Sequence, residues 1–154
     1  MSGKKIAIVT GASSGMGREM VYLLADHFAA LEEIWVIARR KDRLEELVGK
    51  VPVSLRILPF DLSDEEDLCM LSGLLKQEQP NVKILVNGAG YGKTGAAGTI
   101  PGSLSTGMVR LNDEALVAVT EMVLPYISGN SRIIQFASAA AFMPQPGFAV
   151  YAAS

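Results

Sequence analysis

The sequence contains few of the features that disulfide scaffolds, membrane spans and nucleic-acid-binding proteins require. Among 154 residues there is one cysteine, which excludes an internal disulfide and fits a reducing compartment. No apolar run approaches the roughly 18 residues that a membrane-spanning helix needs. The net charge of −2 at pH 7 argues against binding of nucleic-acid phosphates. We therefore expect a cytoplasmic protein with neither membrane nor nucleic acid as a partner.

What is present indicates one globular domain. Hydrophobic residues make up 49% of the chain and charged residues 19%, a balance that supports a buried core. The length suits a single domain, and no linker, repeat or low-complexity tract divides it, so residues 1–154 form one expected domain. The apolar run Ile6–Val9 is too short for the core of a signal peptide. We predict no metal site.

Short apolar segments alternate with amphipathic ones along the whole chain. The pattern predicts strands at 5–11, 33–39, 53–61, 82–90 and 132–138, helices at 17–31, 41–50, 63–77 and 108–127, and a long loop at 91–107. In the third of these helices, Ser63 is the expected N-cap, followed by acidic residues that favour the helix dipole. Alternation of this kind is typical of βαβ units. We therefore predict an α/β fold, a Rossmann-type doubly wound parallel sheet with helices on both faces.

A glycine-rich turn, TGASSGMG, joins the first predicted strand to the first predicted helix. In such folds ligands bind at the carboxyl ends of strands, where a helix N-terminus offers backbone N–H groups to phosphate. Gly11 would permit the tight turn, Gly15 the approach of phosphates, and Gly17 the close packing of helix on strand. The spacing Gly-x-x-x-Gly-x-Gly differs from the common Gly-x-Gly-x-x-Gly fingerprint. A dinucleotide site is the favoured interpretation.

Two other interpretations of this turn remain. The stretch GASSG matches the Gly-x-Ser-x-Gly pattern of a nucleophile elbow, with Ser13 as the nucleophile of a hydrolase. Such a site needs a histidine later in the chain, but the single histidine, His27, falls in the same predicted helix and cannot fold back onto Ser13. The remaining alternative is a glycine turn that binds no ligand.

Several separated motifs together resemble the short-chain dehydrogenase/reductase family. The turn TGASSGMG is similar to its cofactor motif, NGAG at Asn87–Gly90 to its Asn-Asn-Ala-Gly, and Asp61-Leu62 to its adenine-contacting pair. Asn112, Ser138 and Tyr151 match catalytic positions of the family in the correct order. The resemblance implies that Asn112, Ser138 and Tyr151 are catalytic and that the cofactor binds at Gly11, Ser13, Ser14, Gly15, Met16, Gly17, Arg39, Arg40, Asp61, Leu62, Asn87, Ala89 and Gly90.

The chemistry that the resemblance implies is hydride transfer between a nicotinamide cofactor and a small-molecule substrate, interconverting a secondary alcohol and a ketone. Tyr151 would act as acid/base, and Ser138 would hydrogen-bond the substrate oxygen. In the family, a lysine four residues after the tyrosine lowers its pKa, and that position would be 155, beyond Ser154. We therefore expect an incomplete sheet with an uncovered edge at its fifth strand, the N-terminal part of a longer enzyme, and little turnover by these residues alone; a natural short form is the alternative.

The turn after the second predicted strand bears on the choice of cofactor. Ala38 occupies the position at which NAD-binding sites usually place an acid, and Arg39 and Arg40 follow it. Arginine suits bidentate binding of a 2′-phosphate, so NADP is favoured over NAD. A solvated basic turn is the alternative, and Asp42 is the candidate acid for NAD.

Some site assignments have structural alternatives. Asn112 also fits a polar position on a helix surface, and Ser138 a turn at a strand end. Phe142, Met143 and Phe148 suit either a substrate pocket or the core. At the level of function, the rival of the oxidoreductase is a catalytically silent nucleotide-binding module. Substrate identity does not follow from these residues, and the family resemblance implies a homo-oligomer, a tetramer or dimer, for the full-length form.

Overall fold

A five-stranded parallel sheet forms the centre of the molecule, in a computed structural model that describes residues 3–96, 98–143 and 145–154. The strand order is β3-β2-β1-β4-β5, with crossovers to either side of β1. The strands are β1 (Lys5–Thr10), β2 (Glu33–Ile37), β3 (Ser54–Leu58), β4 (Asn81–Asn87) and β5 (Ile127–Gln135). This arrangement confirms the predicted doubly wound α/β fold.

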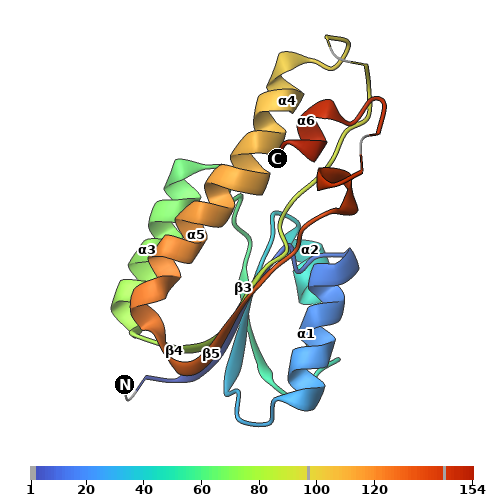
Figure 1. The fold of residues 1–154 in the computed structure, drawn as a ribbon. Helices are drawn as coiled ribbons and strands as arrows, with labels where there is room; N and C mark the ends of the chain where they lie inside the picture. The colour runs from blue at the N-terminus through green and yellow to red at the C-terminus, as the bar shows by residue number, and fades with distance from the viewer. Residues whose placement is uncertain (1–2, 97, 144) are drawn as a thin grey trace.

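Helices cover both faces of the sheet, as Figure 1 shows. α1 and α2 lie on one face and α3 and α5 on the other, while α4 and α6 lie together beyond the strand ends. Their bounds are α1 Gly15–His27, α2 Lys41–Glu45, α3 Glu65–Glu78, α4 Gly102–Val109, α5 Ala115–Val123 and α6 Ala149–Ala152, with a π-helical segment at Arg110–Glu114 and 3₁₀ turns at Leu124–Tyr126 and Ala139–Ala141. Among the described residues, no helix is long and apolar enough to cross a bilayer.

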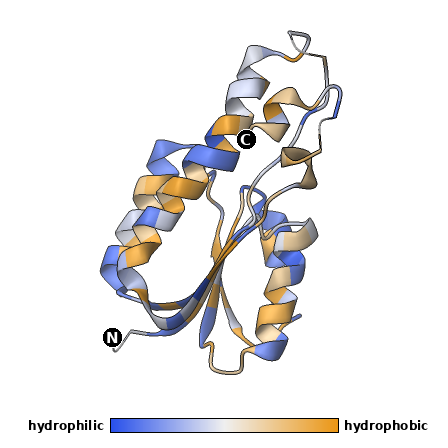
Figure 2. Ribbon diagram, in the orientation of Figure 1, coloured by the Kyte–Doolittle hydropathy of each residue, from blue (hydrophilic) through white to orange (hydrophobic). Residues whose placement is uncertain are grey.

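The alternation of side chains along β1 divides the core into two layers. Ile6 and Ile8 pack with residues of α3 and α5, whereas Ala7 and Val9 pack with residues of α1 and α2. All of them are fully or almost fully buried, which explains why the strand has an uninterrupted apolar sequence. In Figure 2 the helix surfaces that face the sheet are largely hydrophobic. Each buried isoleucine contributes about 1.5–3 kcal/mol relative to an exposed one.

β5 lies at the edge of the sheet, as predicted, and pairs with β4 alone among the described strands. Its predicted bounds, 132–138, were wrong at both ends. The pairing shifts register between Val82 and Ile84, so a bulge of β5 opposes this point and the strand begins at Ile127. The hydroxyl of Ser131 donates to the carbonyl oxygen of Val82 at 2.8 Å, which holds the bulge against β4.

Three helix starts differ from the sequence-based prediction. α1 begins at Gly15, two residues before the predicted 17. α3 is capped by Asp64 rather than Ser63, because an Asp64 carboxylate oxygen accepts the amides of Glu66 at 2.8 Å and Asp67 at 3.3 Å. The hydroxyl of Ser63 instead donates to Asp61 at 2.6 Å. α4 begins at Gly102, inside the segment predicted as a loop at 91–107 and six residues before the predicted helix start at 108.

The helix after the second strand is shorter than predicted. α2 ends at Glu45, and the chain continues in turns to Lys50. Gly49 has a φ of 78°, a left-handed conformation that ends these turns rather than the helix itself. Leu44 and Leu47 are both fully buried against the sheet, so the short helix is held by packing rather than by its length.

Candidate active site

A cleft of about 350 Å³ opens at the carboxyl ends of the central strands. The glycine turn after β1 forms one wall, the residues after β2 and β3 form one end, and the turn after β4 forms the opposite wall. Twelve of the thirteen predicted cofactor-binding residues line this cleft: Gly11, Ser13, Ser14, Gly15, Met16, Gly17, Arg39, Arg40, Asp61, Leu62, Ala89 and Gly90. The thirteenth, Asn87, lines the pocket that adjoins this cleft.

Two glycines are required by close backbone contacts at this turn. Gly11 has a φ of 69°, and a Cβ added to it would lie 2.3 Å from the carbonyl oxygen of Gly88. A Cβ on Gly17 would lie 2.4 Å from the carbonyl oxygen of Gly11. The turn therefore sits directly against the end of β4 and against the start of α1. The N-cap of α1, Ser14, makes no side-chain capping bond, so the first amides of the helix are available to an anion.

Thr10, the last residue of β1, joins the two walls of the cleft. Its buried hydroxyl oxygen accepts the amides of Gly88 at 3.0 Å and Ala89 at 3.1 Å, and donates to the carbonyl oxygen of Val86 at 3.4 Å. These bonds hold the turn after β4 in place beside Gly11. Sequence reasoning missed this role, and the only signal for it was a threonine immediately before the first glycine of the turn.

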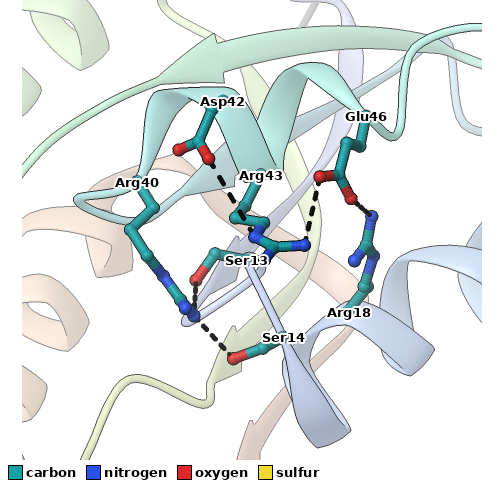
Figure 3. Close-up of polar contacts among 7 residues, drawn as sticks. All are labelled: Ser13, Ser14, Arg18, Arg40, Asp42, Arg43 and Glu46. Carbon is teal, nitrogen blue, oxygen red and sulfur yellow. Dashed lines mark hydrogen bonds and ion pairs between the residues drawn. The ribbon is translucent and has the colours of Figure 1, made fainter.

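Arg40 reaches across from the end of β2 to the glycine turn (Figure 3). Its Nη2 donates to the hydroxyl of Ser13 at 3.0 Å and to that of Ser14 at 2.9 Å. Within the described part of the chain, Arg40 forms no ion pair with a carboxylate. One guanidinium and two hydroxyls thus converge at this end of the cleft, a donor set that suits a phosphate group.

Arg39 and Asp61 face each other across the same end of the cleft. Their closest charged atoms are 3.8 Å apart, and the arginine side chain is 66% exposed, so this ion pair is weak. The Asp61 carboxylate is oriented by Ser63, whose amide and hydroxyl both donate to one of its oxygens. Leu62 is 5% exposed and belongs mainly to the core, although it lines the cleft.

A second pocket of about 170 Å³ adjoins the cleft. Met16, Gly88, Ala89 and Gly90 line both, so the two spaces are continuous around the end of β4. The second pocket is also lined by the three predicted catalytic residues, Asn112, Ser138 and Tyr151. The fold therefore brings these three side chains, from distant parts of the chain, to one pocket.

The side chain of Asn112 is hydrogen-bonded on both its oxygen and its nitrogen, and is not a free polar group on the helix surface. It lies in the π-helical segment, where its Oδ1 accepts the amide of Tyr91 and its Nδ2 donates to the Tyr91 carbonyl oxygen, both at 3.0 Å. Its Nδ2 also donates to the hydroxyl of Ser154 at 3.0 Å, and that hydroxyl donates to the carbonyl oxygen of Tyr151 at 3.2 Å. Asn112 thus links the chain after β4 to the helix that carries Tyr151.

The ring of Tyr151 packs directly on the backbone of Gly92. A Cβ on Gly92 would lie 2.8 Å from the ring Cδ2 and 2.9 Å from Cγ. On another side, the ring of Phe148 is 5.7 Å away between centroids, at an angle of 54°. The phenol is therefore positioned by a glycine and by an aromatic neighbour. The contact with Gly92 joins residues 59 positions apart, and nothing in the sequence pattern signalled it.

Ser138 lies three residues beyond the end of β5 and not at the strand end as predicted. Its Oγ accepts the amide of Ala140 at 3.2 Å and so caps a 3₁₀ turn. This is the geometry of the turn alternative, and it leaves the hydroxyl proton available toward the pocket that Ser138 lines. Phe142 and Met143 are 87% and 59% exposed, and neither they nor Phe148 line that pocket.

Asn87 lines the second pocket rather than the first cleft, so its predicted role in cofactor binding stays a prediction. Its side chain is buried between β4, β5 and α5, where Nδ2 donates to Thr120 at 2.9 Å and Gln135 at 3.2 Å. The Asn87 Oδ1 has no hydrogen-bond partner among the described residues. Because Asn87 is the last residue of β4, its side chain points along the sheet face toward α5, while Gly88 and Ala89 form the cleft wall.

Comparison with known proteins agrees with this geometry. The sequence matches the family model described as short chain dehydrogenase over residues 5–154. It is 30% identical to the uncharacterized oxidoreductase YusZ of Bacillus subtilis and 32% identical to sulfoacetaldehyde reductase 2 of Chromohalobacter salexigens, over 98% and 97% of this chain. It spans only 55% and 60% of those two proteins.

Among solved structures, the chain is similar to a short-chain dehydrogenase from Sphingobium yanoikuyae in complex with NADPH. The TM-score is 0.86 at 27% identity, over 97% of this chain and 59% of that one. The match to the family model covers nearly every residue, and the fold and the order of motifs agree with it. The chain therefore belongs to the short-chain dehydrogenase family of oxidoreductases.

Proposed function

We propose that the protein binds NADP and interconverts a secondary alcohol and a ketone. The observation that supports the proposal most directly is that the cleft and the second pocket are continuous at the strand ends. The cleft has donors suited to phosphate at one end, and it leads past Met16 to the pocket that Tyr151 and Ser138 line. A dinucleotide has the same extended form, with phosphates at its middle and its reactive ring at one end.

The residues present fit such a cofactor. Gly11 and Gly17 allow the turn to pack closely against the backbone around it, no atom lies within 4 Å of a Cβ position on Gly15, and the uncapped start of α1 supplies N–H groups for the diphosphate. Arg40, Ser13 and Ser14 would hold the 2′-phosphate, which is the difference between NADP and NAD. Asp61 would contact the adenine. When bound, the nicotinamide supplies or accepts the hydride.

The chain's own chemistry would be proton transfer and stabilisation of charge on the substrate oxygen. Hydride addition to a carbonyl leaves negative charge on oxygen, which the Tyr151 phenol would neutralise by donating its proton. The Ser138 hydroxyl would donate a hydrogen bond to the same oxygen. Asn112 acts on this geometry through Tyr91 and Ser154, as a positioning residue.

Titration with NADPH and NADH tests the cofactor assignment. We expect tighter binding of NADPH, and Arg40→Gln should weaken NADPH binding roughly 10- to 100-fold while leaving NADH nearly unchanged. Lys41→Gln is the matched control, because it removes the same charge from the next residue, which pairs with Glu45 at 3.6 Å. Preference for NADH by the unaltered chain would refute the assignment.

Turnover separates the oxidoreductase from the catalytically silent module. We expect little oxidation of NADPH by residues 1–154 alone and clear oxidation with a small ketone by the full-length form, in which Tyr151→Phe should abolish turnover without changing NADPH affinity, because only the phenolic proton is lost. Binding of NADPH by the full-length form without turnover of any member of a ketone and alcohol panel would instead support the silent module.

A further inference from the structure

An acidic residue just outside the cleft, Glu46, forms ion pairs with two arginines near Arg40. Figure 3 shows Glu46 between Arg18 and Arg43. One Glu46 oxygen lies 2.8 Å from Nη2 of Arg18 and the other 3.2 Å from Nη1 of Arg43. Both carboxylate oxygens are thus engaged, one by a residue of α1 and one by a residue of α2. Arg40, by contrast, contacts only hydroxyls.

Both paired arginines lie within one helical turn of the expected 2′-phosphate site. The amide of Arg18 donates to the carbonyl oxygen of Ser14, and Arg43 follows Arg40 by three residues at the start of α2. The Arg43 side chain is 49% exposed, and its other acidic contact, Asp42, is longer at 4.0 Å, so loss of Glu46 would loosen it. The hydrogen bond from Arg18 lowers the pKa of Glu46, so the carboxylate is charged at neutral pH.

We propose that Glu46 sets the degree to which this site prefers a 2′-phosphate, by holding Arg18 and Arg43 in ion pairs and placing a negative charge beside the site. The proposal rests on the assignment of Arg40, Ser13 and Ser14 to the 2′-phosphate. That phosphate is attracted by every unpaired cation nearby and repelled by a carboxylate. The 2′-hydroxyl of NAD is neutral and is neither attracted nor repelled in this way. Glu46 therefore changes the preference for NADP over NAD and not nucleotide affinity in general.

Loss of the Glu46 charge should therefore strengthen binding of the phosphorylated ligand. Glu46→Gln removes one negative charge, takes away the carboxylate partner of Arg18, and leaves Arg43 with only its longer contact to Asp42 at 4.0 Å, so that one of the two guanidinium groups can add a charge-assisted contact to phosphate. Adenosine 2′,5′-bisphosphate and 5′-AMP are suitable probes, because they differ only in the 2′-phosphate. We expect the ratio of their affinities to rise about three- to tenfold in Glu46→Gln, and the rise to shrink at high salt.

The chain offers a matched control in the preceding residue. Glu45→Gln removes the same charge from the last residue of α2, directly before Glu46, but Glu45 pairs with Lys41 and forms no ion pair with Arg18 or Arg43. We expect the affinity ratio to stay within about twofold of the unaltered chain. The double variant Glu46→Gln/Arg43→Gln restores the local charge and should return most of the way to the original ratio.

The outcomes distinguish a tuning role from a structural one. If Glu46 only fastens α1 to α2, Glu46→Gln will lower the thermal unfolding temperature and weaken both probes equally, which overturns the proposal. An unchanged or lower ratio in Glu46→Gln also overturns it. If the unaltered chain does not distinguish the two probes, the 2′-phosphate assignment itself fails, and this is visible before any variant is made. A higher ratio in Glu46→Gln alone supports the proposal.

Discussion

Substitution of Gly11 by alanine should lower the free energy of unfolding far more than the same substitution at Gly15. A Cβ at Gly11 meets the backbone of the turn after β4, at 2.3 Å from the oxygen of Gly88 and 2.8 Å from the nitrogen of Ala89. Gly15 also has a positive φ, of 55°, but nothing lies within 4 Å of its Cβ position. Gly73, inside α3, has equally open surroundings and no positive φ.

The magnitudes follow from these differences. Alanine in the left-handed conformation costs about 1–2 kcal/mol, which applies to both Gly11 and Gly15. At Gly11 the contact is with backbone that the Thr10 hydroxyl holds in place, so overpacking adds about 1–3 kcal/mol or more. We therefore expect losses of about 2–5 kcal/mol for Gly11→Ala and about 1–2 kcal/mol for Gly15→Ala. Gly73→Ala should stabilise by about 0.5–1 kcal/mol, because alanine favours a helix interior.

Urea unfolding followed by circular dichroism measures all three variants. The urea midpoints should fall in the order Gly73→Ala, unaltered chain, Gly15→Ala and Gly11→Ala. In thermal unfolding of the same variants, each kcal/mol should shift the midpoint by about 2–4 °C. Nucleotide titration adds a second contrast, since Gly15→Ala should fold but lose NADPH affinity if the diphosphate fills the open space beside it. Equal midpoints for Gly11→Ala and Gly15→Ala would refute the close backbone contact as a determinant of stability.

Two further predictions concern Tyr151 and Glu46. Gly92→Ala should displace the ring of Tyr151 and change its near-ultraviolet circular dichroism, whereas Gly102→Ala, with no atom within 4 Å of its Cβ position, should not; identical spectra would contradict the packing. The hydrogen bond from Arg18 lowers the pKa of Glu46 below its ordinary value of 4.5, so its stabilising effect is present above that pH and is lost as the pH falls through the lowered pKa. The difference in urea midpoint between the unaltered chain and Glu46→Gln should thus be larger at about pH 7 than at about pH 3, and a difference independent of pH would count against the ion pair.

The layout of the fold was predictable because the apolar pattern and the glycine turn are local signals. The uninterrupted apolar sequence of β1 follows from burial on both faces, and the positions of Gly11 and Gly17 follow from backbone contacts that only glycine allows. The start of α4 was not predictable in the same way. Gly102 and Ser103 are poor helix formers, and the helix forms there because it packs beside α6 and buries its own Met108.

Details of the site depend on contacts between distant residues, which no local pattern contains. Thr10 and Gly88 meet because β1 and β4 are neighbours, and Gly92 meets Tyr151 because the chain after β4 passes α6 beyond the sheet. The N-cap of α3 was predicted wrongly as Ser63 because the Ser63 hydroxyl donates to Asp61 instead. Asp64 caps the helix in place of Ser63. The roles of Asn112, Ser138 and Tyr151 in catalysis stay predictions, as do the oligomeric state and the single-domain boundary.

The most direct test of the account is an NMR titration of the isotope-labelled chain with NADPH. If the diphosphate lies over the glycine turn and the 2′-phosphate on Arg40, the largest amide shifts will map to residues 11–17, 38–40 and 88–90, and NADH will leave those at 38–40 nearly unmoved. Shifts that saturate elsewhere, with the amides of 11–17 unaffected, would contradict the proposed site.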